Sequence, residues 1–457
     1  MTTRIPETVQ ALAGWRFTSA SGQQHSVSTR RVILERGAIE KLPGAIEELG
    51  LGRRAWILAD ENTFAAAGEQ TRRVLEAAGI EVRQSILRAH DGYIGADDIY
   101  LDQAREGVWE EAELFVGVGS GVINDLTRLL VLERGVRYAA VATAASVNGY
   151  GSPISSFIEK GVKIIKPSAR TDVIVADLDV LTAAPVRLSQ SGFGDLLAKN
   201  TSNTDWYLAH LVTGTGYTPI PVEMVRRAGQ RAIRLASGVG RRDPESIEVL
   251  IAGLIAGAFA MDSAGVTAPA SGGEHLISHY MEMVAHFRNY QPPMHGEQVA
   301  LGTLIASSLY ERLLEADLDG LDVDGLVERY PEWPQRSEQV RCDHGELAEI
   351  VMPEARKQQK TKAQYRAHLE TIRRAWPQFV QQARDSVLPA GTIREAYEAA
   401  GTPTRASQLE IDPALVRKAY LLARDVRDRY TVLHLAGDLG LLASLADEVL
   451  DRSGVLR

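Results

Sequence analysis

Three segments with helical periodicity carry residue types that bind divalent metals. Asp195 lies in GFGDLLAKN, His275 and His279 lie in SGGEHLISHY, and His295 lies in PPMHGEQVALG. Residues four apart share one face of a helix, so His275 and His279 can approach a single point. One carboxylate and two imidazoles suit zinc, iron or nickel and leave positions open for a substrate oxygen. The residues alone leave the alternative open that these side chains are solvated or satisfied in a core.

A glycine-rich turn joins an apolar strand pattern to a helical pattern, in ELFVGVG followed by GSGVINDLTRLLVLE. Gly117, Gly119 and Gly121 permit close backbone approach, and the free N–H groups of a new helix favour a pyrophosphate. The pattern therefore predicts a dinucleotide site, although such turns also use glycine only for geometry. The spacing departs from G-x-G-x-x-G, because Asn124 stands where the third glycine would be.

Two further strand ends carry polar residues. Asp60 ends RAWILAD, where a carboxylate can accept hydrogen bonds from a ribose, or can cap the helix that follows. Thr143, Ser146, Asn148 and Ser152 follow the apolar strand YAAVA in a small-polar loop. Such loops contact ligands on rigid scaffolds, but Ser, Asn and Gly also simply make turns. Both interpretations stay open for these residues.

The elements that would position these side chains fall into two halves. From about residue 30, short β-branched runs alternate with amphipathic helical stretches, which is the order of a doubly wound parallel sheet. After DVIVADLDVL, helical periodicity dominates; it includes the apolar stretch Ile247–Gly265 and a helix that starts at Asp412 and Pro413. We predict a Rossmann-like α/β domain over residues 1–180 and an all-α domain over residues 181–457.

Composition restricts the function classes. The 457 residues are 45% hydrophobic and 24% charged, as in globular proteins, and the net charge of −9 disfavours a nucleic-acid partner. A single cysteine, Cys342, excludes an intrachain disulfide and a cysteine-based metal site. The N-terminal segment has no long apolar run, and we find none of the length that a membrane span requires. We expect a soluble, cytoplasmic protein with no membrane partner.

Longer motifs occur together and in order: GSGVINDLTR, TAASVNGYGSP, VIVADLDVLTAAP, GFGDLLAKNTSNTDWYLAH, SGGEHLISHYMEM and HGEQVALGTL. This series resembles bacterial sn-glycerol-1-phosphate dehydrogenases, within the superfamily of iron-containing alcohol dehydrogenases, glycerol dehydrogenases and dehydroquinate synthases. The resemblance extends over most of the chain. It implies a dehydroquinate synthase-like fold, NAD or NADP, one divalent metal ion (zinc, nickel or iron), and interconversion of dihydroxyacetone phosphate and sn-glycerol 1-phosphate. We also expect a homodimer or a larger homo-oligomer.

The resemblance assigns roles residue by residue. It implies that Asp195, His275 and His295 bind the metal and that His279 contacts the substrate and relays a proton, with Asp195 also beside the substrate. The implied NAD(P)-binding residues are Asp60, Gly119, Ser120, Gly121, Val122, Ile123, Thr143, Ala144, Ala145, Ser146 and Ser152. Lys163, Lys166, Arg170 and Lys199 are unranked candidates for the substrate phosphate.

One departure from the family affects substrate identity. The family usually has aspartate where this chain has Asn148, at a position that contacts the hydroxyl-bearing end of the substrate. Asparagine keeps an acceptor oxygen, adds an amide donor and removes a charge. A dehydrogenase of another polyol or sugar phosphate is therefore the first alternative. A sugar-phosphate cyclase is a second, although those relatives typically have glutamate as first metal ligand where this chain has Asp195. A non-catalytic binding protein is a third.

Overall fold

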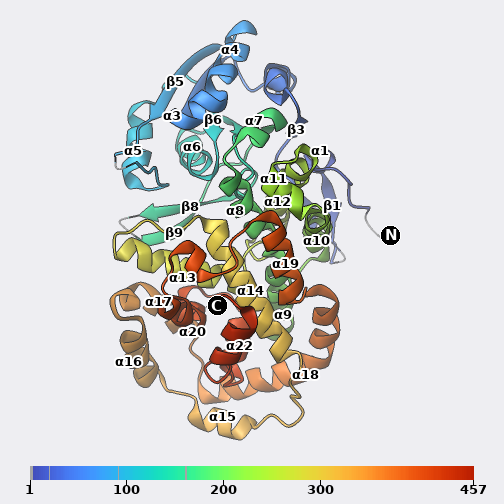
Figure 1. Cartoon of the computed structure of the whole chain (residues 1–457), viewed down its shortest axis with the longest axis vertical. Helices are drawn as coiled ribbons and strands as arrows, with labels where there is room; N and C mark the ends of the chain where they lie inside the picture. Colours follow the sequence, from blue (N-terminus) through green and yellow to red (C-terminus); the bar gives the residue numbers. More distant parts are fainter. Residues whose placement is uncertain (1–3, 20, 91, 160–161) are drawn as a thin grey trace. The chain divides into compact units, whose positions relative to one another are not determined.

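The computed structural model describes residues 4–19, 21–90, 92–159 and 162–457 (Figure 1). The chain forms two compact units, each of them discontinuous in sequence. The sheet unit comprises Met1–Leu196 and Thr218–Thr267, and the helical unit comprises Leu197–Tyr217 and Ala268–Arg457. The division at residue 180 stays a prediction about where the cofactor-binding part ends.

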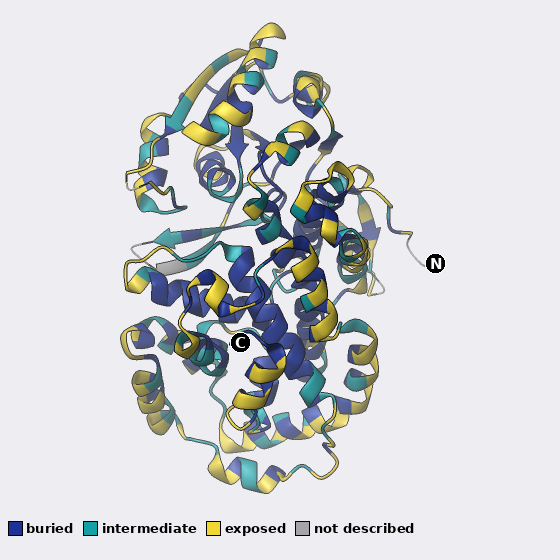
Figure 2. Cartoon of the chain, viewed as in Figure 1, coloured by how far each residue is buried: buried dark blue, intermediate teal, exposed yellow. Residues whose placement is uncertain are grey.

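The sheet unit is built on six parallel strands in the order β3-β10-β7-β6-β4-β5. The strands are β3 (Arg31–Glu35), β4 (Arg54–Asp60), β5 (Glu81–Leu87), β6 (Leu114–Gly119), β7 (Arg137–Ala142) and β10 (Val173–Asp177). The connecting helices are α2 (Leu42–Leu49), α4 (Glu69–Ala77), α5 (Asp98–Glu106) and α6 (Gly121–Arg134). The middle strands are buried along nearly their whole length, as their uninterrupted apolar sequences require (Figure 2). The predicted doubly wound parallel sheet is confirmed.

The order of the strands predicts where a ligand binds to this sheet. From β4 the chain moves outward to β5, then returns past β4 to β6 and continues to β7 and β10 on the other side. The direction of winding therefore reverses between β4 and β6. In open α/β sheets, ligands bind outside the carboxyl ends of the strands at such a reversal. Asp60 ends β4 and Gly119 ends β6, so two of the predicted cofactor residues flank this point.

Local structure departs from the sequence pattern at three places. The helical segment between β4 and β5 is interrupted by a π-helical segment, Phe64–Gly68. Two antiparallel hairpins were not predicted: β1 (Arg16–Thr18) with β2 (Gln24–Ser26), and β8 (Ile154–Glu159) with β9 (Val162–Pro167). Neither hairpin joins the six-stranded sheet, although Ile158 of β8 makes one isolated bridge to Asp97. Their strands lack the uniformly apolar sequences of the buried sheet.

The sheet unit also contains helices beyond its last parallel strand: α7 (Leu178–Ala183), α8 (Val186–Leu197), α10 (Pro219–Arg234), α11 (Ala236–Arg241) and α12 (Pro244–Ala264). The apolar stretch predicted as a buried helix forms α12. By length and hydropathy α12 could cross a membrane, but 83% of its most apolar window is buried inside the protein. That burial is typical of a core helix.

The helical unit contains no strand among its described residues. Its α-helices are α9 (Lys199–Thr213), α13 (Gly273–Phe287), α14 (His295–Leu313), α15 (Val323–Arg329), α16 (Trp333–His344), α17 (Ala348–Gln358), α18 (Lys362–Ser386), α19 (Ala390–Ala400), α20 (Pro413–Leu422), α21 (Val432–Asp438) and α22 (Ala446–Ser453). The predicted helix start is confirmed at α20, where the Asp412 carboxylate accepts from the N–H of Ala414 at 2.9 Å. Helices α13 and α14 are buried along most of their length (Figure 2).

A buried histidine in α21 makes stability depend on pH. Burial, reinforced by the positive charge of Arg424, lowers the pKa of His434 from 6.5 to about 4. The unfolded chain therefore takes up a proton below pH 6.5 that the folded chain excludes until about pH 4, so stability falls as pH falls. We expect unfolding by urea to require about 2 kcal/mol less at pH 5 than at pH 7.5 from this group. His434→Gln should remove that part of the pH dependence, and an unchanged profile would contradict the assignment.

Candidate functional site

The glycine turn after β6 brings the start of a helix to the carboxyl end of a buried strand. β6 ends at Gly119, Ser120 precedes the first turn, and α6 begins at Gly121. A Cβ at Gly119 would lie 2.5 Å from the Cβ of Ile123, and one at Gly121 would lie 3.1 Å from Val147. Larger residues would push the start of the helix outward. The N–H groups of a 14-residue helix therefore open directly at the carboxyl edge of the sheet.

Asp60 caps a helix, which is one of the two roles that its sequence context predicts. Its carboxylate accepts from the N–H of Thr63 at 2.8 Å, and its own N–H donates to the Thr63 hydroxyl at 3.0 Å. This capping box opens α3 (Glu61–Thr63). The contact uses one carboxylate oxygen, Oδ1, so a role for Asp60 toward a ribose stays a prediction.

The loop after β7 is organised by side chains that sequence reasoning did not single out for function. The Arg128 guanidinium is fully buried and donates to the carbonyls of Gly149 at 2.9 Å, Ala169 at 3.0 Å and Ile154 at 3.0 Å. It also contacts the Ser152 carbonyl and the Ser168 hydroxyl. The sequence does contain a signal for this residue, because a charged arginine stands inside the largely apolar helical segment GVINDLTRLLVLE.

Asn124 has a structural reason to replace the third glycine of the nucleotide motif. Its side-chain amide donates to the Gly149 carbonyl at 3.3 Å, and its side-chain oxygen accepts from the Tyr138 hydroxyl at 3.0 Å. Asn124 therefore ties α6 to β7 and to the loop that follows. Within that loop Thr143, Ala144, Ala145, Ser146 and Ser152 are all buried, and the Ser152 hydroxyl bonds locally to Ile154.

Arg128 should therefore contribute strongly to stability. We expect Arg128→Met to lower the free energy of unfolding by about 3 kcal/mol or more, because several buried carbonyl groups would lose their donor. The matched control is Arg134→Met on the same helix, where the arginine pairs with Glu110 at the surface. That exposed pair should contribute less than about 1 kcal/mol. Equal losses in the two variants, measured by urea denaturation, would contradict the role of Arg128.

Asp195 lies near the C-terminal end of α8 and contacts the same loop. Its carboxylate accepts from the backbone N–H of Asn148 at 3.1 Å. One turn earlier, a Cβ at Gly192 would lie 1.9 Å from the Ala145 carbonyl oxygen, so only glycine permits α8 to approach the loop this closely. The predicted metal ligand, the substrate residue Asn148 and the predicted cofactor loop are thus neighbours within the sheet unit.

The three predicted histidines cluster in the helical unit. His275 and His279 lie one turn apart on α13, and His295 is the first residue of α14. The ring centroids are 5.3 Å apart for His275 and His295, and 6.0 Å apart for the other two pairs. A Cβ at Gly302 would lie 2.3 Å from the Glu274 carbonyl oxygen, so this glycine permits the close contact of α14 with α13. The imidazoles are close enough together for a shared ligand.

Two glutamates that the sequence analysis did not identify orient these imidazoles. Nδ1 of His275 lies 2.7 Å from Oε1 of Glu274, and Nδ1 of His295 lies 3.2 Å from Oε1 of Glu282. Burial opposes ionisation of Glu274, but the hydrogen bond and charge of His275 hold the pKa of Glu274 below its ordinary value. A carboxylate at Nδ1 selects the tautomer in which Nε2 carries the lone pair that binds a metal.

The residues present therefore fit a divalent metal ion. Imidazoles are typical ligands, and carboxylates that lie at the opposite ring nitrogen, as Glu274 and Glu282 do here, are their usual partners. His279, Glu282 and His295 also each offer a ligand atom within 4.8 Å of one another. Glu282 is thus placed either to orient His295 or to bind a metal itself.

A buried polar network holds Glu274 in place. Its Oε2 accepts from the Thr201 hydroxyl at 2.8 Å, and its Oε1 accepts from the N–H of Gly272 at 2.7 Å. Beside it, Asp205 accepts from the N–H groups of Gly273 and Val432, each at 2.7 Å. Burial and the nearby charge of Glu274 raise the pKa of Asp205 to about 7. These bonds connect α9, α13 and α21 around the start of the histidine helix.

Glu274→Gln should weaken metal binding while leaving the ligand set complete. An amide can accept from His275 but can also present its NH₂ group, so the tautomer is no longer selected. We expect affinity for zinc, measured by competition with a chelator, to fall about 10- to 100-fold. Glu349→Gln on α17, an exposed site, is the control and should bind as the wild type does. Unchanged affinity in Glu274→Gln would overturn the orienting role.

The candidates for the substrate phosphate have other contacts within the structure. The Lys199 ammonium donates to the Ala270 carbonyl at 3.0 Å. Lys166 pairs with Glu159 at 2.7 Å, and Arg170 lies 3.7 Å from Asp262. The side chain of Lys163 lies outside the described residues. The phosphate-binding residue therefore stays unassigned.

Comparisons with known proteins find relatives by sequence and by fold. A family model described as iron-containing alcohol dehydrogenase matches residues 33–185. A glycerol-1-phosphate dehydrogenase (NAD(P)+) of Halalkalibacterium halodurans is 34% identical over 306 residues, which cover 66% of this chain and 76% of the relative. One from Bacillus licheniformis is 28% identical and covers 92% of each chain. Among solved structures, a probable glycerol dehydrogenase from Sinorhizobium meliloti has a TM-score of 0.60 at 17% identity and covers 93% of this chain and 98% of that one. The predicted fold class is confirmed.

Proposed function

The chain belongs to the glycerol-1-phosphate dehydrogenase family, and on that premise we propose that it interconverts dihydroxyacetone phosphate and sn-glycerol 1-phosphate with NAD or NADP. The observation that carries the proposal is the histidine cluster of α13 and α14, with a carboxylate at Nδ1 of His275 and of His295. Such a cluster has no evident purpose in a protein that only binds a nucleotide. The enzyme is thus an oxidoreductase that needs a divalent metal.

We assign the metal to Asp195, His275 and His295. Support comes from the family resemblance, from the carboxylates at Nδ1 of the two histidines, and from the chemistry of one carboxylate with two imidazoles. Zinc, nickel and iron all accept this ligand set. When bound, the metal polarises the substrate carbonyl and the reduced nicotinamide supplies hydride.

The other residues bind and position. The turn from Gly119 to Ile123 offers its N–H groups to the pyrophosphate, and Asp60 and the loop from Thr143 to Ser152 contact the rest of the cofactor. We propose that Asp195, whose carboxylate accepts from the backbone N–H of Asn148, contacts both the metal and the substrate. His279 stands one turn from His275 and holds the proton that the product oxygen receives.

Asn148 favours one alternative, a dehydrogenase of another polyol or sugar phosphate. The asparagine adds a donor and removes a charge where the family usually has aspartate. The experiment is oxidation of NADH followed by absorbance, with dihydroxyacetone phosphate beside unphosphorylated dihydroxyacetone. Oxidation with the phosphate ester alone supports the proposal. No oxidation with either ketone would favour the alternative. Asn148→Asp would then show whether this residue determines which substrate is accepted.

We propose that the protein is cytoplasmic and that its binding partner is a small phosphorylated substrate. We also propose a homodimer or larger homo-oligomer. The net charge of −9 and the buried α12 helix support a protein that acts away from nucleic acid and membrane.

A further inference from the structure

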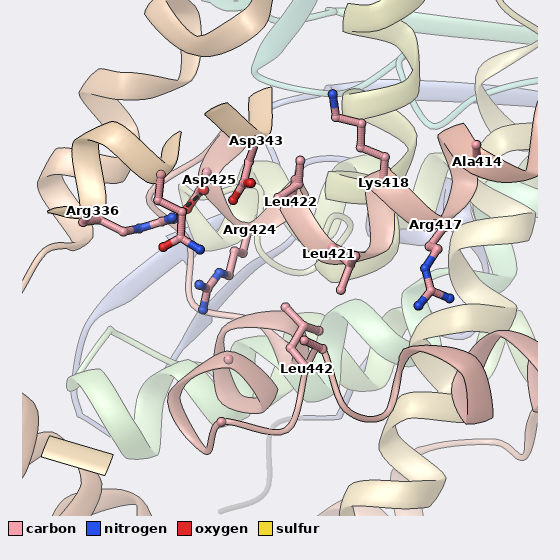
Figure 3. Close-up of a pocket in the computed structure, with 14 residues that line it drawn as sticks. Arg336, Asp343, Ala414, Arg417, Lys418, Leu421, Leu422, Arg424, Asp425 and Leu442 are labelled. Atoms are coloured by element: carbon pink, nitrogen blue, oxygen red, sulfur yellow. Dashed lines mark hydrogen bonds and ion pairs between the residues drawn. The ribbon is translucent and has the colours of Figure 1, made fainter. Parts of the chain in front are cut away.

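A cavity lies within the helical unit, apart from the histidine cluster. It has a volume of about 530 Å³ and is lined by residues of α16, α20, the 3₁₀ segment η5 (Ala423–Val426), α21 and the turn that follows (Figure 3). That volume is within the range of small-molecule sites. None of the three histidines lines it, although α20 and η5 pack against α13.

Positive charge predominates in the lining. Arg336, Arg417, Lys418 and Arg424 face two carboxylates, those of Asp343 and Asp425. Asp425 is neutralised by Arg336, which lies 2.5 Å from both of its oxygens, and by Nε2 of His344 at 3.0 Å. Burial opposes ionisation of Asp425, but the His344 hydrogen bond and the charges of the two arginines keep its pKa below its ordinary value. Of the other lining cations, Arg417 pairs with Asp447, so Arg424 is the guanidinium that remains for an anion.

Arg424 is the residue with unused donors. In the part of the chain that the structure describes, its guanidinium makes no hydrogen bond or ion pair with a side chain or a carbonyl. The nearest acids have other partners: Asp425 bonds to Arg336, and Asp438 accepts from His368 at 2.8 Å and from Tyr430 at 2.9 Å. A guanidinium has five donors in a planar fork that matches phosphate or carboxylate.

The position of this guanidinium is set by the backbone. A Cβ at Gly437 would lie 1.9 Å from an Nη atom of Arg424, so the absence of a side chain there makes room for the arginine. In Figure 3 the side chains of Arg417, Leu421 and Arg424 extend from α20 and η5 toward Leu442, whereas Lys418 points away from it. Two guanidinium groups thus flank a leucine floor formed by Leu421 and Leu442.

We propose that this cavity binds a small organic anion, with its phosphate on Arg424 and its apolar part on Leu421 and Leu442. Arg417 contributes more weakly, because it pairs with the exposed carboxylate of Asp447. Because the two leucines lie beside Arg424, we expect the cavity to bind an anion that carries an apolar group more tightly than inorganic phosphate. This site is independent of the proposed function.

The test is titration calorimetry of the metal-loaded full chain with phenyl phosphate and with inorganic phosphate. We expect phenyl phosphate to bind more tightly, and Arg424→Gln to weaken both by tenfold or more. Leu421→Asn should weaken phenyl phosphate alone, and it carries the test if Arg424→Gln does not fold. Arg366→Gln, an arginine of α18 that pairs with Asp324 outside the cavity, is the matched control and should change neither.

The variants must also separate this site from the reaction. Neither Arg424 nor Leu421 belongs to the residues assigned to cofactor, metal or substrate, so KM for dihydroxyacetone phosphate should stay within twofold of the wild type in both. Binding of phenyl phosphate that is unchanged in Arg424→Gln or in Leu421→Asn would overturn the proposal. So would equal affinity of the wild type for phenyl phosphate and inorganic phosphate.

Discussion

His275→Ala is expected to abolish metal binding and reduction of dihydroxyacetone phosphate together. The variant removes one of the two imidazoles assigned to the metal, the one whose Nδ1 lies against Glu274. Loss of Lewis-acid stabilisation worth several kcal/mol corresponds to a fall in kcat/KM of about 10³-fold or more. His295→Ala should behave in the same way.

The measurement combines metal content after dialysis with kcat/KM for dihydroxyacetone phosphate. The matched control is His286→Ala, in the last turn of the same helix but outside the cluster, which should retain both. Full metal content in His275→Ala would contradict the ligand assignment. If His295→Ala kept its metal while Glu282→Gln lost it, Glu282 would be a ligand and not an orienting residue.

Gly119→Val should impair cofactor binding without removing the metal. A Cβ at this position would lie 2.5 Å from the Cβ of Ile123, so the first turn of α6 must move away from the strand end. Overpacking of this kind costs about 1–3 kcal/mol, which is about a 5- to 150-fold loss of NADH affinity if the pyrophosphate lies at the helix start.

Fluorescence titration with NADH checks this prediction. Gly44→Ala on α2 is the control, since nothing lies within 4 Å of a Cβ there and alanine favours a helix. It should bind NADH normally. If Gly119→Val also binds NADH with the wild-type affinity, the pyrophosphate does not lie at this turn. That conclusion holds whether or not the variant keeps its metal.

The parallel sheet was predictable because buried parallel strands have uniformly apolar sequences. β4 and β6 each stand out as such a run, and a glycine-rich turn follows β6. The hairpin of β8 and β9 was not predictable, because its strands lack that pattern and do not join the six-stranded sheet. The α12 helix was identified as buried, but no sequence signal indicated that it packs in the sheet unit.

For the candidate site, the sequence identified the histidines but not the glutamates that orient them. His275 and His279 follow helical spacing, which is a local property. Glu274 is adjacent to His275 in sequence, a spacing that normally places side chains on different faces of a helix. Its hydrogen bond to Nδ1 depends on the bends at Gly272 and on Thr201 from another helix. Such contacts arise from tertiary packing.

The most direct test of the central claim is metal removal and restoration with the wild-type protein. The chain is stripped with a chelator, and NADH oxidation with dihydroxyacetone phosphate is followed before and after addition of zinc, nickel or ferrous iron. We predict that the stripped protein is inactive and that at least one of these ions restores oxidation at one equivalent per chain. Full activity of the stripped protein would contradict the account.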